Sequence, residues 1–130
     1  MSKRIQVVCG VVIKNDKILI ARRKNEKSNG GLWEFPGGKL EIGEGEADCL
    51  ERELMEELSM QVHVESRLGS VIFLDATCEI ELIAHSCTWL SQGERLVDHD
   101  KLEWVNPSDL SGIDFSPADI ELLKTIEINQ

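Results

Sequence analysis

The chain has 130 residues, which is enough for one domain with a buried core and too few for two. Its apolar content of 42% and charged content of 29% are typical of a folded globular protein and exclude a disordered chain. A formal net charge of −10 argues against binding to nucleic acid polymers or anionic membranes, and no apolar run is long enough to span a bilayer. We therefore expect one domain over residues 1–130, either a monomer or a homodimer.

The first part of the chain alternates strand-like and turn-like segments. It begins with a strand-like pattern instead of a signal peptide, so we expect a cytoplasmic protein. Residues 5–13 are rich in β-branched side chains, residues 14–17 favour a turn, and residues 18–21 are again apolar, which predicts a β-hairpin. Residues 32–35 are expected to be extended, and Pro36-Gly37-Gly38 predicts a sharp turn.

From residue 45 to residue 58 the apolar residues follow a helical period. One stripe of this predicted helix is formed by Ala47, Leu50, Leu54 and Leu58. Further strands are expected at residues 60–65, 70–74, 79–90 and 102–105. Ser116-Pro117 then opens a last helix. These elements predict an α/β (α+β) fold with a mixed sheet and at least two helices.

The first predicted helix carries an unusual density of acidic side chains. Residues 41–57 contain eight carboxylates and a single base, Arg52. Glu53, Glu56 and Glu57 occupy an arc of about 100° beside the apolar stripe, where they repel one another. Arg52 is expected to neutralise only one of them. A hard divalent cation such as Mg²⁺ would remove the repulsion, while a solvated acidic helix remains the alternative on these residues alone.

The spacing around this helix matches a specific pattern. Gly38 is followed after five residues by Glu44, and after seven more by Arg-Glu-Leu-Met-Glu-Glu at 52–57. This segment resembles the Nudix box. Four further features are similar to the MutT branch of that family, and within it to the CTP pyrophosphohydrolase group. They are the segment at 32–38, the Arg22-Arg23 pair, Trp104 and Pro117-Ala118-Asp119.

One position departs from the box. Ser59 stands where the pattern has Gly. We expect a left-handed backbone there and a stability cost on the order of 1 kcal/mol, without loss of chemistry.

The resemblance implies an α/β/α sandwich around a mixed sheet. It also implies hydrolysis of a nucleoside diphosphate linked to another group. For the MutT branch, water attacks the β-phosphorus of a (deoxy)nucleoside triphosphate and releases a monophosphate and pyrophosphate. CTP, 5-methyl-dCTP and 8-oxo-dGTP are the expected substrates. Alternatives within the family are hydrolysis of ADP-ribose, a dinucleotide or a nucleotide sugar, and a non-catalytic nucleotide-sensing module.

The resemblance also assigns the residues of the box. With a carbonyl of Gly37 or Gly38, the glutamates 53, 56 and 57 would hold Mg²⁺, for which Mn²⁺ is a possible substitute. Glu53 is the first candidate for the base that activates water, and Arg52 would orient it. Glu44 would be an outer ligand or a support for the helix start.

Outside the box, each expected role has a structural alternative. Asp98 is a second candidate base or a solvated loop residue, and the neighbouring His99 is taken as a loop histidine. The residues expected to bind substrate are Arg23, Glu34, Phe35, Lys39 and Asp119. Phe35 is equally typical of a core aromatic residue. Asp119 accepts a hydrogen bond from a nucleobase amino group, helps Ser116 cap the last helix, or does both.

Overall fold

The computed structural model describes residues 3–128 except 92 and 94. In chain order its elements are β1 (Lys3–Lys14), β2 (Lys17–Arg23), β3 (Trp33–Glu34), β4 (Gly37–Lys39), α1 (Glu46–Leu58), β5 (Gln61–Leu74), β6 (Cys78–Ser91), β7 (His99–Val105), the 3-10 helix η1 (Pro107–Gly112) and α2 (Pro117–Thr125).

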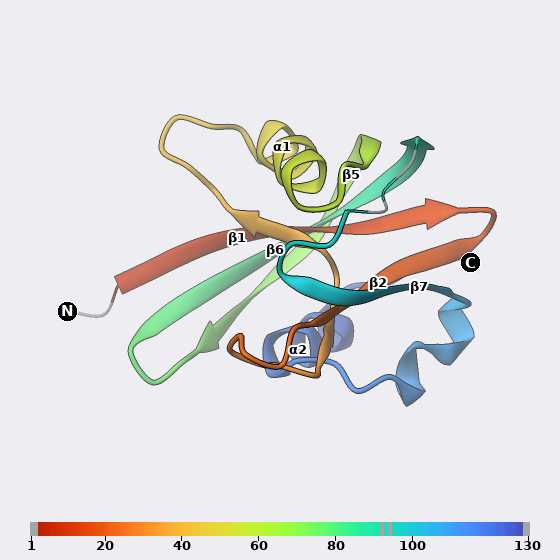
Figure 1. Cartoon of the computed structure of the whole chain (residues 1–130). Helices are drawn as coiled ribbons and strands as arrows, with labels where there is room; N and C mark the ends of the chain where they lie inside the picture. The colour runs from red at the N-terminus through yellow and green to blue at the C-terminus, as the bar shows by residue number, and fades with distance from the viewer. Residues whose placement is uncertain (1–2, 92, 94, 129–130) are drawn as a thin grey trace.

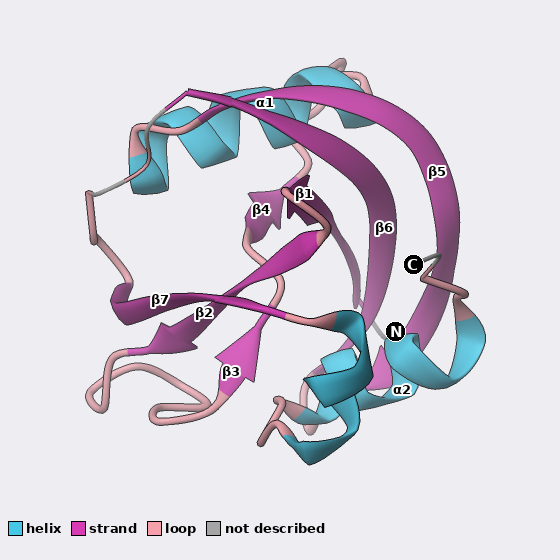
Figure 2. Cartoon of the chain, turned by 90° about the vertical axis from the view of Figure 1, so that its right-hand side faces the viewer, coloured by secondary structure: helices cyan, strands magenta, loops and turns pink. Residues whose placement is uncertain are grey.

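The strands of the described residues form one mixed sheet in the order β3-β2-β1-β6-β5. β1 pairs in parallel with β6, while β5 pairs with β6 and β2 with β1 in antiparallel fashion. Two further strands extend the sheet off this path, since β4 pairs with β1 and β7 pairs with β2, both antiparallel. Figure 2 shows β5 and β6 curving together along one side, with β2, β3 and β7 on the other.

The two α-helices cover opposite faces of this sheet (Figure 1). Because side chains alternate along β1, Val8 and Val12 pack under α1 while Cys9 and Val11 face the α2 side. The stripe of α1 buries Leu50, Leu54 and Leu58 completely, and α2 buries Leu122. The predicted α/β/α sandwich with a mixed sheet is confirmed.

The structure differs from the sequence-based prediction at β5 and at the Pro-Gly-Gly segment. β5 is continuous where two strands were predicted, because register shifts along its ladder with β6 absorb the polar interval around Gly69. Gly37 and Gly38 are not only a turn, since they form β4 and pair with Cys9 and Val8. A side chain on Gly37 would overlap the carbonyl of Val8, so only glycine allows this approach.

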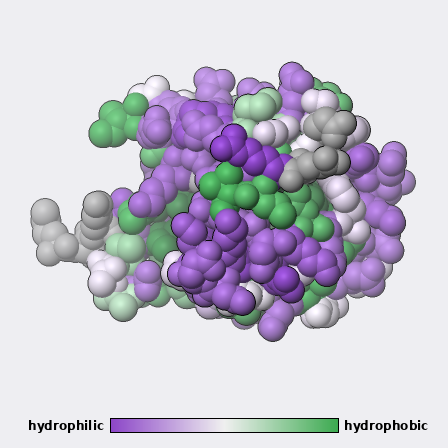
Figure 3. All heavy atoms as spheres, viewed as in Figure 1, coloured by the Kyte–Doolittle hydropathy of each residue, from purple (hydrophilic) through white to green (hydrophobic). Residues whose placement is uncertain are grey.

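Polar residues cover most of the molecular face seen in Figure 3, and apolar residues gather in a patch near its centre. No helix of the described residues is long and apolar enough to cross a membrane.

Ser59 ends α1 in the left-handed conformation expected from its position, with φ 53° and ψ 36°. Its backbone N–H donates to the carbonyl of Met55, and its side chain is exposed. We predict that Ser59→Gly raises the free energy of unfolding by roughly 0.5 to 1 kcal/mol, because glycine adopts this conformation without strain. Urea titration measures the change. Ser59→Ala is the matched control, and an equal gain in that variant would contradict the explanation.

Candidate active site

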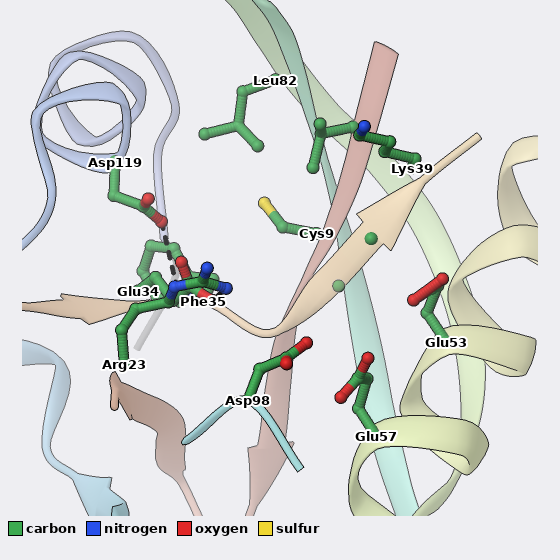
Figure 4. Close-up of a pocket in the computed structure, with 13 residues that line it drawn as sticks. Cys9, Arg23, Glu34, Phe35, Lys39, Glu53, Glu57, Leu82, Asp98 and Asp119 are labelled. Carbon is green, nitrogen blue, oxygen red and sulfur yellow. Dashed lines mark hydrogen bonds and ion pairs between the residues drawn. The ribbon is translucent and has the colours of Figure 1, made fainter. Parts of the chain in front are cut away.

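A cavity of about 380 Å³ opens between α1, β4 and the segment before β7 (Figure 4). It is lined by Val7, Cys9, Arg23, Glu34, Phe35, Gly37, Gly38, Lys39, Glu53, Glu57, Leu82, Asp98 and Asp119. The fold thus brings together most of the residues singled out from the sequence. Arg52 and Glu56 are not part of the lining.

Arg52 donates hydrogen bonds to three carboxylates at once and lies 3.7 Å from a fourth, that of Glu41. Its Nε lies 2.7 Å from Glu44 Oε2, and its Nη2 lies 3.0 Å from Glu44 Oε1. Its Nη1 lies 3.1 Å from Glu53 Oε1 and 3.2 Å from Glu56 Oε2. Arg52 therefore contacts two of the glutamates 53, 56 and 57 and not only one, because the turn of α1 brings both within reach of its planar fork; the preceding loop adds Glu44.

Glu44 is engaged through both carboxylate oxygens. The hydrogen bonds from Arg52 hold the pKa of Glu44 at about 2, and Oε1 also accepts the backbone N–H of Glu41 at 3.2 Å. These contacts favour a role in supporting Arg52 and the loop before α1 over a role as an outer metal ligand.

Glu53 and Glu57 extend from α1 toward β4 (Figure 4). The Glu53 carboxylate fills the space that a side chain on Gly38 would occupy, so this glycine allows the carboxylate to lie against the backbone of β4. Burial raises the pKa of Glu53, and the hydrogen bond from Arg52 opposes that rise. Glu53 is therefore held in place while its affinity for a proton is increased.

Asp98 faces Glu57 across the cavity (Figure 4). Lys27 Nζ lies 3.2 Å from Asp98 Oδ1. Burial and the neighbouring Asp98 raise the pKa of Glu57. Burial acts to raise the pKa of Asp98, but its contacts with Lys27 and Glu57 act to lower it. The pKa of Asp98 is therefore below its ordinary value. Asp98 thus lines the cavity and is not simply a solvated loop residue.

The residues at this end of the cavity fit a divalent cation. Glu57 Oε2 is buried and accepts no hydrogen bond from the described residues. Within the described ranges no three His, Cys, Asp or Glu side chains are already grouped as a metal site, and the carboxylate of Glu56 is turned to Arg52. Mg²⁺ commonly uses only one or two carboxylates and completes its shell with water and substrate phosphates. Glu53 and Glu57, beside the Gly37-Gly38 backbone, meet that requirement.

Arg23, Glu34, Phe35 and Asp119 form the other end of the cavity (Figure 4). The ring of Phe35 is buried and packs 5.3 Å from that of Phe115, so Phe35 also serves the core. Its backbone N–H donates to Asp119 Oδ1 at 3.0 Å. Lys39 is exposed on the rim.

Asp119 has a different local role from the expected cap. Ser116 makes no side-chain cap hydrogen bond, and its hydroxyl instead donates to Asp119 Oδ2 at 2.6 Å. Burial raises the pKa of Asp119 to about 7, although the hydrogen bonds from Ser116 and Phe35 act to lower it. A buried carboxyl group at the cavity wall can thus exchange a proton near neutral pH.

Several residues that form or support the cavity were not predicted from the sequence. Val7, Cys9 and Leu82 form an apolar wall, which depends on the parallel pairing of β1 with β6. The interpretation of His99 as a loop histidine is wrong, since it is 2% exposed at the start of β7 and contacts Glu34. The only sequence signal for this burial is the apolar strand pattern that follows His99.

We predict that Asp119 makes wild-type stability depend on pH. Because the pKa of Asp119 is raised in the folded state, its contribution to the free energy of unfolding is greatest below about pH 4. This contribution is lost as the pH rises to about 7. The free energy of unfolding of the wild type, measured relative to Asp119→Asn, should fall by up to roughly 1.4 kcal/mol per pH unit in this window. Denaturant titrations at several pH values measure this difference, and a difference independent of pH would contradict it.

Known proteins resemble this chain along most of its length. A family model described as NUDIX domain matches residues 8–125. The CTP pyrophosphohydrolase of Escherichia coli is 32% identical over 126 residues, covering 94% of this chain and 90% of that protein. The 8-oxo-dGTP diphosphatase of Proteus vulgaris is 43% identical over 62 residues, covering 47% of this chain and 55% of that protein.

The solved structures agree with the sequence comparisons. The solution structure of the E. coli ORF135 protein has a TM-score of 0.84 and 33% identity, with coverage of 95% of this chain and 89% of that chain. The chain therefore belongs to the Nudix family and is a MutT-like hydrolase of phosphoanhydride bonds.

Proposed function

We propose that this enzyme is a Mg²⁺-dependent nucleoside triphosphate pyrophosphohydrolase. It converts a (deoxy)nucleoside triphosphate, such as CTP, 5-methyl-dCTP or 8-oxo-dGTP, to a monophosphate and pyrophosphate. The observation that carries the proposal is the division of one cavity into two ends. Glu53, Glu57 and Asp98 form an acidic end suited to a cation and phosphates, and Glu34 and Asp119 form an end with hydrogen-bond acceptors for a nucleobase.

The acidic end supports a hydrolytic step. A Mg²⁺ ion bound there would polarise the phosphoryl oxygens and lower the pKa of a bound water. Arg52 holds Glu53 Oε1, and the absence of a side chain on Gly38 leaves room for Oε2 at the cavity. Because burial raises its pKa, Glu53 is suited to take a proton from water. Asp98, 3.2 Å from Lys27, remains the second candidate base.

The proton transfer accompanies cleavage of one bond. As the base takes a proton from water, the water oxygen bonds to the β-phosphorus. The bond from that phosphorus to the α–β bridging oxygen breaks, and the monophosphate leaves with this oxygen. Glu56, which contacts Arg52 at 3.2 Å, is suited to hold Arg52 in place and could join the metal ligands if its side chain turned.

The nucleobase end supports a compact substrate. A volume of about 380 Å³ lies at the low end of the range for small-molecule sites. Glu34 and Asp119 supply carboxylate oxygens that accept hydrogen bonds from amino or imino groups. Both the cytosine and the 8-oxoguanine rings carry such donors, in agreement with the substrates named for the relatives from E. coli and P. vulgaris.

We predict that Glu53→Gln lowers kcat by roughly 10²- to 10⁴-fold, because the variant lacks the base. The measurement is pyrophosphate release from a panel of nucleoside triphosphates with Mg²⁺. Glu51→Gln is the matched control, since Glu51 is an exposed carboxylate of the same helix and is outside the cavity lining. It should keep the wild-type rate.

The same panel, run in ¹⁸O-enriched water, identifies the attacked phosphorus. Attack at the β-phosphorus places the label in pyrophosphate, and attack at the α-phosphorus places it in the monophosphate. Turnover of ADP-ribose or a nucleotide sugar without turnover of any triphosphate would contradict the proposed substrate class. Full activity of Glu53→Gln would contradict its role as the base.

A further inference from the structure

Asp98 and His99 are consecutive residues that contact opposite ends of the cavity, Asp98 as part of its lining and His99 through Glu34. Asp98 faces Glu57 at the acidic end. His99 Nε2 instead lies 2.8 Å from Glu34 Oε2 at the nucleobase end. Asp98 lies in the bend just before β7 and His99 is the first residue of β7, so one short stretch of backbone contributes to both ends.

Three adjacent strands bring the partners of Glu34 together. Glu34 lies on β3, beside Ala21 of β2, and His99 of β7 pairs with Arg23 of β2. Arg23 Nη1 lies 3.7 Å from Glu34 Oε2, the same oxygen that His99 contacts. Both contacts hold the same oxygen of Glu34, a residue that lines the cavity, and neither of them involves Oε1.

The surroundings of His99 determine which ring nitrogen carries hydrogen. The side chain is 3% exposed, and Nδ1 is buried with no partner among the described residues. A carboxylate only accepts hydrogen bonds, so Nε2 must be the donor to Glu34. If Nδ1 carries no hydrogen, one buried acceptor lacks a partner. If Nδ1 carries a hydrogen, a buried N–H donor lacks a partner, which is the more costly arrangement. The Nε2–H tautomer therefore fits both nitrogens.

We infer that His99 is a positioning residue that determines nucleobase specificity through Glu34. By donating to Oε2, His99 fixes the carboxylate so that Oε1 accepts a hydrogen bond from the bound base. This selects bases whose buried edge carries an amino group over bases that present a carbonyl oxygen at the same place, because two acceptors repel each other. The inference rests on the proposed function and names the feature of the substrate that the site recognises.

Binding of CMP and UMP, which have no phosphoanhydride bond to hydrolyse, tests this inference. The two monophosphates are similar in size, but cytosine has an amino group where uracil has a carbonyl oxygen. Calorimetry should show that wild type prefers CMP, and that His99→Leu weakens CMP binding roughly tenfold with little change for UMP. The KM for CTP should rise similarly while kcat changes much less, because Arg52 and Glu53 are unaffected.

Two matched variants separate positioning from folding. His99→Gln keeps an N–H donor and should retain most of the preference for CMP. His63→Leu removes an exposed histidine of β5, outside the cavity lining, and should behave as wild type. If His99→Leu is folded and keeps the full preference, or if His99→Gln loses it at an unchanged Tm, the inference is overturned.

The tautomer itself gives a direct test in the wild-type enzyme. Nitrogen-15 NMR of His99 should show hydrogen on Nε2 and a bare Nδ1, and the opposite tautomer would overturn the inference. These binding and NMR measurements do not require turnover. The protein could show a preference for CMP that depends on His99 and yet hydrolyse no triphosphate. That result would refute the proposed function and support this inference.

Discussion

The contact of one guanidinium group with three carboxylates is the interaction on which the rest of the site depends. Glutamates spaced along one edge of a helix repel one another, and Arg52 offsets this repulsion by binding Glu44, Glu53 and Glu56 together. Glu57 is left outside this network, with a buried oxygen that has no partner among the described residues. Negative charge is thus concentrated at the cavity, where a divalent cation and a phosphate chain can use it.

The fold provides the opposite wall of this site. Leu50 and Leu54 fix α1 on the sheet by burying its apolar stripe. The glycines of β4 then allow close approach, since Gly37 lies against the backbone of β1 and Gly38 against the carboxylate of Glu53. Helix packing and glycine placement therefore act together, because neither alone would bring Glu53 to the cavity.

The sequence predicted those features that depend on local spacing. The stripe at Leu50 and Leu54 predicted α1, and the box spacing singled out Glu53 and Glu57, which line the cavity, but also Glu56, which does not. Features that depend on distant segments could not be read in this way. Burial of His99 requires β7 to pair with β2, and the apolar wall containing Leu82 requires β6 to run beside β1. The contact of Arg52 with Glu44 similarly depends on the path of the loop before α1.

The central claim is that Glu53 and Glu57 hold a divalent cation beside the nucleotide. Electron paramagnetic resonance measures this binding when Mn²⁺ replaces Mg²⁺. The sample also contains a nucleoside triphosphate whose α- and β-phosphates are joined by a non-hydrolysable methylene bridge. Wild type and Glu51→Gln should bind Mn²⁺ equally well, while Glu57→Gln should bind it at least roughly tenfold more weakly because a carboxylate ligand is lost. Equal binding by all three proteins would contradict the claim.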